Sequence, residues 1–144
     1  MHHTILLFMK EYFTLRELLQ STTAKRYNID NTPSFEVVAN LRRLCTDVLN
    51  PCRAKYGNPV IVTSGYRSPE LNARVGGVKN SQHQFGMAAD LVCSNLPLLF
   101  EILKSNVNID QLLFEHNAKS RWLHVSIAPL GRLPRGIIIN NYNA

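Results

Sequence analysis

The sequence predicts an α+β domain in which helices pack against a small, largely antiparallel sheet. Apolar residues between positions 34 and 49 recur with the spacing of an amphipathic helix. β-Branched residues at 60–64 follow a Gly-Asn-Pro break and are typical of a strand. Further short strands are expected at 88–92, 111–114 and 122–127. Helices and strands do not alternate regularly, which favours α+β over a parallel α/β sheet.

Two helices are expected in the N-terminal third. Thr14 has Glu17 three positions later, which is the capping-box pattern that opens a short helix. A polar, turn-rich stretch at 28–33 separates it from the longer helix at 34–49. We expect Pro51 to end that helix, because the residue before a proline disfavours the helical conformation. The apolar positions expected to face the core are Phe35, Val37, Val38, Leu41, Leu44, Cys45, Val48 and Leu49.

The remaining elements follow from turn and cap signals. Ser68-Pro69 opens a short helix that runs through Asn72, and Gly76-Gly77 forms a loop. The strand at 88–92 carries Asp90, and a helix at 96–103 tolerates Pro97 in its first turn. Three isoleucines at 137–139 are expected to add an edge strand.

Composition indicates an ordinary globular protein. The chain has 144 residues, of which 45% are hydrophobic and 18% are charged. We expect one domain, over residues 9–144, and a monomer. The net charge of +6 favours solubility or attraction to a polyanion. No run of Lys or Arg is interleaved with aromatic residues, so we expect no nucleic-acid partner.

The N-terminus and the cysteines bear on location. Residues 1–8 read as an extension without assigned function, with no basic region or cleavage site of a signal peptide. Their apolar run is too short to span a membrane, so we expect no membrane insertion and a cytoplasmic site of synthesis.

The chain has three cysteines, Cys45, Cys52 and Cys93. Because their number is odd and no two form a Cys-x-x-Cys pair, free thiols in a reducing compartment are favoured over a disulfide.

Three residues form a candidate metal site. His83 and Asp90 lie seven positions apart, separated by small residues, and His124 follows in the predicted strand at 122–127. Two imidazoles and a carboxylate suit Zn²⁺, and three protein ligands leave the fourth position open for water, as in catalytic zinc sites.

These residues belong to a longer pattern. The pattern Ser-x-His-x-x-Gly-x-Ala-x-Asp at 81–90, with Trp-x-His-Val-Ser at 122–126, resembles the zinc D-Ala-D-Ala carboxypeptidase family. The resemblance is to small cell-wall peptidases of phage and gut-bacterial type. It implies the Hedgehog/DD-peptidase fold, a Zn²⁺ held by His83, Asp90 and His124, and peptidoglycan stem peptides as substrates. Further matching stretches lie at 13–18, 28–33, 64–69 and 75–80, and the resemblance runs from about Tyr12 to about Ile127.

The catalytic base departs from the common family pattern. Many members carry a carboxylate three positions before the last histidine, where this chain has Arg121, which cannot accept a proton. Relatives with this shorter layout carry a glutamate on the adjoining strand, which assigns the base to Glu115. His116 should point to the opposite face, because neighbouring side chains alternate along a strand.

Four residues are candidates for substrate contacts. Arg67 is expected to bind a substrate carboxylate or the developing oxyanion, as a catalytic and binding residue. Ser81 and Gln82 are expected to bind the peptide backbone or to orient His83, and Trp122 to wall the cleft or to pack in the core.

Alternatives remain open at this point. The resemblance leaves two bonds open, D-Ala-D-Ala or another stem-peptide bond such as L-Ala-D-Glu. It is also compatible with a phage endolysin released to the cell wall. A non-catalytic, zinc-bearing cell-wall-binding module of Hedgehog-like type is the alternative outside enzymes, and Arg121 in the usual base position favours it.

Overall fold

A five-stranded sheet forms the centre of the structure, which is a computed structural model that describes residues 10–142. The extension predicted at residues 1–8 lies outside the described residues. The strand order is β1-β2-β4-β3-β5; β1, β2, β4 and β3 pair antiparallel, and β5 runs parallel to β3. The strands are β1 (Ile61–Ser64), β2 (Ala88–Val92), β3 (Ile109–His116), β4 (Arg121–Ile127) and β5 (Ile137–Asn140). This arrangement confirms the predicted α+β class and its largely antiparallel sheet.

The α-helices described here are α2 (Leu15–Leu19), α3 (Thr22–Arg26), α4 (Phe35–Leu44), α5 (Asn50–Tyr56), α6 (Pro69–Arg74) and α7 (Leu96–Lys104). All of them except α5 begin after a polar residue that caps them. Thr14 forms the predicted capping box with Glu17, and Ser68 accepts a hydrogen bond from the backbone N–H of Leu71 at the start of α6. Helix α3 was not predicted, although Ser21 caps it by accepting from the N–H of Ala24.

The helix that begins at Phe35 continues past Pro51, so the prediction that proline ends it is wrong. Between α4 and α5 lies one π-helical turn, η1 (Cys45–Leu49), in which the N–H of Asn50 donates to the carbonyl of Cys45. This turn shifts the hydrogen-bond ladder by one residue. Pro51 then lies in the first turn of α5, where a missing N–H costs little.

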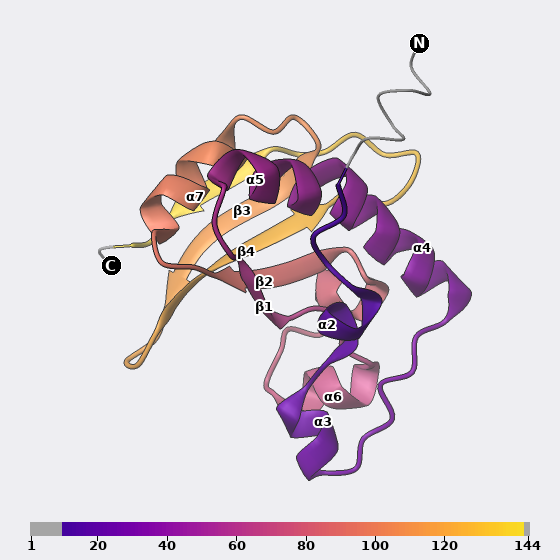
Figure 1. The fold of residues 1–144 in the computed structure, drawn as a ribbon. Coiled ribbons are helices and arrows are strands. Elements are labelled where there is room, and N and C mark those ends of the chain that lie inside the picture. The colour runs from indigo at the N-terminus through magenta and orange to yellow at the C-terminus, as the bar shows by residue number, and fades with distance from the viewer. Residues whose placement is uncertain (1–9, 143–144) are drawn as a thin grey trace.

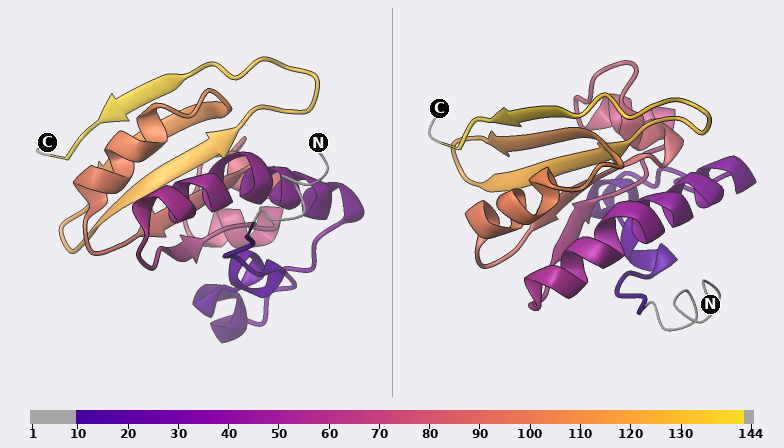
Figure 2. Two further views of the ribbon diagram at one scale, coloured as in Figure 1. Left: turned by 45° about the horizontal axis from the view of Figure 1, so that its top comes forward. Right: turned by 90° about the horizontal axis from the view of Figure 1, so that it is seen from above.

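Helices α4, α5 and α7 cover one face of the sheet (Figure 1 and Figure 2). Fully buried residues from both layers meet there, including Leu44, Leu99, Leu112 and Val125. Phe35 was predicted to join this core and does not, since it is 97% exposed. It lies in the first turn of α4, where the helix projects beyond the sheet.

A cavity lies on the opposite face of the sheet. Along β3, Leu112 and Phe114 are buried in the core, whereas Leu113 and Glu115 alternate with them and line this cavity. A 3₁₀ turn, η2 (Gln82–Phe85), precedes β2 beside this face. Among the described residues, no helix is long and apolar enough to cross a bilayer.

Candidate metal centre

Strand pairing and one 3₁₀ turn bring the three predicted ligands together. Asp90 of β2 lies directly opposite His124 of β4, and His83 projects from η2 toward the same point. The ligand atoms all lie within 4.8 Å of one another. The Asp90 Oδ1 atom is 3.2 Å from His83 Nε2 and 3.2 Å from His124 Nδ1. Ligands of a tetrahedral zinc ion lie roughly 3.4 Å apart, given metal–ligand bonds of about 2.0–2.2 Å, so the donor set fits Zn²⁺.

The backbone sets the tautomer of His83. Its Nδ1 lies 2.7 Å from the carbonyl oxygen of Gly65, an acceptor that requires a proton on Nδ1. The lone pair of the neutral ring is then on Nε2, which faces Asp90 and His124. His83 is only 3% exposed, so the ring is held in this orientation and suits metal binding.

Asp90 is a largely buried carboxylate that is charged. Burial by itself would raise its pKa, but hydrogen bonds and charge interactions with His124 and His83 hold the pKa well below its ordinary value. Its second oxygen, Oδ2, lies 3.4 Å from Arg67 Nη2. A buried charge needs a compensating cation, and the position between two imidazoles is where a metal ion would supply it.

Arg67 is held in place by three acceptors. Its Nε donates to Ser64 Oγ at 2.9 Å, Nη1 to Asn72 Oδ1 at 3.1 Å, and Nη2 to Asp90 Oδ2 at 3.4 Å. Three of the five N–H groups of a guanidinium are thereby used, and two remain available. Arg67 therefore orients Asp90 and still presents donors to the cavity that it lines.

A cavity of about 600 Å³ lies over the centre. Its walls include all eight residues that the sequence analysis assigned to the site: Arg67, Ser81, Gln82, His83, Asp90, Glu115, Trp122 and His124. Glu115 and Trp122 are cross-strand partners, two residues along the ladder from the pair formed by Leu113 and His124. The roles expected of Glu115 and Trp122 stay predictions; both residues line the same cavity as the three ligands.

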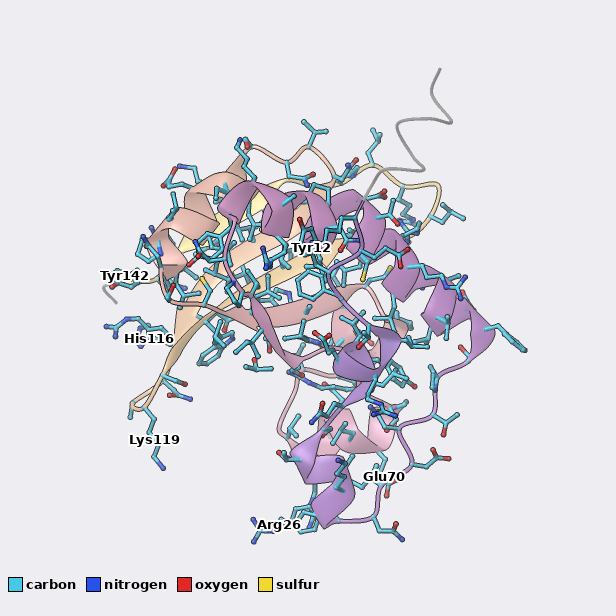
Figure 3. All side chains as sticks on the ribbon, viewed as in Figure 1. Tyr12, Arg26, Glu70, His116, Lys119 and Tyr142 are labelled. Carbon is cyan, nitrogen blue, oxygen red and sulfur yellow. The ribbon has the colours of Figure 1, made fainter. Side chains whose placement is uncertain are left out.

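His116 lies outside the cavity lining, as the alternation along β3 predicts. Figure 3 shows its side chain directed outward from the molecule, above the end of the hairpin that carries Lys119. It is therefore a suitable control residue for the metal centre.

Ser81 and Gln82 make contacts within the protein. Ser81 Oγ accepts from the backbone N–H of His83 at 3.2 Å and so caps η2. The amide nitrogen of Gln82 donates to Asp110 Oδ2 at 3.0 Å and to the Ile127 carbonyl at 3.3 Å. Both residues thus help to fix the turn that holds His83.

The sequence analysis missed the charged cavity residue Arg135 and also Asp110, the buried carboxylate that holds it. Asp110 is 2% exposed and forms an ion pair with Arg135 at 2.6 Å. A carboxylate in the apolar run Ile109–Phe114 was a usable signal, because a buried charge requires a partner. Arg135 offered no such signal, since it lies in a loop 25 positions away.

The α+β fold and the centre of two histidines and one aspartate together define a site of the kind found in metal-dependent hydrolases. Residues 11–126 match the family described as Peptidase M15, so the chain belongs to this peptidase family. A segment of 33 residues is 52% identical to the zinc D-Ala-D-Ala carboxypeptidase of Streptomyces albus G. That segment covers 23% of this chain and 13% of the length of the relative.

Proposed function

We propose that this protein is a zinc-dependent peptidase that hydrolyses peptide bonds in peptidoglycan stem peptides. The observation that carries the proposal is a three-ligand centre with a carboxylate, Glu115, in the same cavity. Membership of the Peptidase M15 family supports a peptidase, and the name of the Streptomyces relative supports zinc and a cell-wall substrate.

When bound, Zn²⁺ would polarise the scissile carbonyl and lower the pKa of water from 15.7 to about 7. Glu115 is the group that accepts the proton of the attacking water and then delivers it to the leaving nitrogen. Arg121 cannot do so, because a guanidinium is not a proton acceptor. The side chain of Arg121 is exposed, and its Nε donates to the Tyr142 carbonyl at 3.2 Å.

Other side chains would position the substrate. The two unused N–H groups of Arg67 can donate to the oxygen of the scissile carbonyl as negative charge develops on it. Trp122, opposite Glu115, offers an apolar wall for the peptide. The proposal covers both a D-Ala-D-Ala carboxypeptidase and an endolysin-type endopeptidase acting on another stem-peptide bond, such as L-Ala-D-Glu.

A second candidate is a non-catalytic, zinc-bearing module that binds the cell wall. Arg121 favours it, since it stands where many relatives carry the base. The two candidates differ in one respect: the module would bind stem peptides without cleaving them.

The substitution Glu115→Gln tests the proposal. It keeps the shape of the side chain and removes the proton acceptor, so zinc and peptide binding should persist while kcat falls about 10²–10⁴-fold. Hydrolysis of purified stem peptides, followed by mass spectrometry, measures the effect. His116→Gln is the matched control and should cleave like the parent.

Three results discriminate between the alternatives. An unchanged rate for Glu115→Gln would place the base elsewhere. A parent protein that binds stem peptides and cleaves none of their bonds would support the binding module. If the parent and His116→Gln cleave stem peptides and Glu115→Gln does not, the result supports a peptidase with Glu115 as its base.

A further inference from the structure

We propose that Arg135 binds a carboxylate of the peptide substrate that is separate from the scissile carbonyl. The inference rests on the proposed function, and it concerns the part of the cavity beyond the metal ligands. Arg135 lies in the loop between β4 and β5 and lines the same cavity as Arg67 and Glu115.

The register of the sheet separates Arg135 from the proton acceptor. Leu113 pairs with His124, and Glu115 lies two residues farther along β3. Asp110, which holds Arg135, lies three residues in the other direction, about 10 Å along the strand at 3.3 Å per residue. The cavity thus extends to both sides of the metal centre, with Glu115 toward one end and Arg135 toward the other.

A bulge in β3 accounts for the placement of Asp110. The pairing of β3 with β4 shifts in register between Ile109 and Gln111, and such an irregularity re-aims the side chain at that point. Asp110 Oδ1 accepts from the backbone N–H and the Nε of Arg135 at 2.9 and 3.1 Å. Its Oδ2 accepts from Nη2 at 2.6 Å.

These contacts hold one edge of the guanidinium and leave the other edge free. Arg135 Nη1 makes no hydrogen bond within residues 10–142, and the side chain is 56% exposed. An arginine already fixed by a carboxylate loses little conformational freedom when it binds a second one, and its free edge matches the geometry of a carboxylate.

Gln82 helps to fix the Asp110–Arg135 pair. Both hydrogens of its amide are used, by Asp110 and by the Ile127 carbonyl, so the orientation of the amide is set. Its Oε1 is buried and has no hydrogen-bond partner among the described residues. This oxygen is out of reach of a substrate, so Gln82 contributes by holding Asp110, and through it Arg135, in place.

The test compares Arg135→Gln with Arg132→Gln on matched peptides. Arg132 is exposed in the same loop and lies outside the cavity lining, so its variant controls for the loss of one positive charge. The substrates are a stem peptide with free carboxylates, the same peptide with a C-terminal carboxamide, and one with the internal carboxylate amidated.

We expect Arg135→Gln to raise KM for the free-acid peptide by about 10- to 100-fold, with a smaller change in kcat. The parent should discriminate against one of the two amidated peptides, which identifies the carboxylate as terminal or internal. Arg135→Gln should lose that discrimination, whereas Arg132→Gln should keep it.

Other results would overturn the proposal. If Arg135→Gln prefers the free-acid peptide by the same factor as the parent, Arg135 does not bind the carboxylate. Its role is then only to connect its loop to the sheet. If Arg135→Gln does not fold, Arg135→Lys takes its place. It keeps the charge and loses the planar fork, and unchanged discrimination in this variant counts against the proposal as well.

Binding measurements separate this inference from the proposed function. Calorimetry measures the affinity for the free-acid and amidated peptides and requires no turnover. The two proteins compared are Glu115→Gln and the double variant Glu115→Gln, Arg135→Gln. If the parent cleaves nothing, the proposed function fails, yet a carboxylate-dependent loss of affinity in the double variant still supports Arg135. Equal affinities of the two variants for all peptides overturn it.

Discussion

Gly65 supports the metal centre although it has no side chain. Its carbonyl holds His83 Nδ1, and a Cβ at this position would collide with the carbonyl of Leu18 in α2. The neighbouring N–H of Tyr66 donates to that same Leu18 carbonyl at 2.8 Å. A short N-terminal helix and a metal ligand are therefore connected through one backbone segment that has no room for a larger residue.

Gly65→Ala should consequently weaken both folding and metal binding. Backbone displacement caused by an added methyl group costs about 1–3 kcal/mol of unfolding free energy. Misplacing a group that orients a ligand lowers metal affinity about 10–100-fold. Denaturant unfolding and titration against a competing chelator measure the two effects.

Gly131→Ala is the control for this substitution. Gly131 has φ +84° and no atom near its Cβ position, so alanine there should cost about 1–2 kcal/mol of strain and leave zinc affinity unchanged. Parental zinc affinity in Gly65→Ala would show that the Gly65 carbonyl does not set the orientation of His83.

The ligand assignment itself predicts the metal content. The parent should carry about one Zn²⁺ per chain, and the double variant His83→Ala, His124→Ala should carry almost none. Elemental analysis after dialysis measures both proteins, with His116→Ala as the variant that keeps its zinc. Full occupancy in the double variant is the result that would contradict the site.

Spacing within short motifs predicted the metal ligands but not the residues that surround them. His83 and Asp90 lie in one short motif, and Glu115 was assigned from the family resemblance together with an expected pair of adjacent strands. Arg135 could not be found in this way, because its role depends on a loop folding back to Asp110. The contacts that hold Arg67 to Ser64 and Asn72 likewise depend on three-dimensional placement.

The long helical segment from α4 through η1 to α5 shows where rules for single elements fail. Apolar spacing correctly predicted its start near Ser34, which is the N-cap of α4. The rule for Pro51 failed because the π turn accommodates the missing donor, and Phe35 was misassigned because the first turn of α4 extends past the sheet. Periodicity shows which residues share a helix face, but not how far the sheet beneath that face extends.

This segment also determines the reactivity of two thiols. The structure confirms that Cys45 and Cys52 are free. Burial raises the pKa of Cys52 to about 12 and that of Cys45 to about 11. Because the thiolate is the reactive form, Cys52 should resist alkylation at neutral pH in the folded protein and react readily once the protein is unfolded.

Timed labelling with iodoacetamide and peptide mass spectrometry checks this prediction. The same reaction in denaturant provides the reference rate for each cysteine. A native rate for Cys52 equal to that reference would mean that the junction of η1 and α5 opens freely.

Across the protein as a whole, the metal centre joins segments that are distant in sequence. Its ligands come from η2, β2 and β4, and the Asp90–His124 contact spans 34 positions. An unfolded chain cannot present this geometry, so zinc should bind the folded state and stabilise it. The stabilisation is about 2.7 kcal/mol at a free zinc concentration 100 times Kd and about 4.1 kcal/mol at 1,000 times Kd.

Removing zinc should therefore lower Tm by roughly 5–15 °C, at about 2–4 °C per kcal/mol for a chain of this size. Differential scanning calorimetry with and without EDTA measures the shift. The variant His83→Ala, His124→Ala should melt at the same temperature in both conditions. A zinc-loaded parent whose Tm does not respond to EDTA would show that binding and folding are not linked.

The position of β4 between β2 and β3 has a kinetic consequence. Strands β3 and β4 are joined by a short turn and can pair locally, but His124 meets Asp90 only when this hairpin inserts beside β2. Contacts that close such a long loop form late, so the ion can bind only after most of the folding barrier has been crossed. An interaction absent from the transition state slows unfolding and leaves the folding rate nearly unchanged. Zinc should therefore extend the lifetime of the folded protein without shortening the time in which it forms.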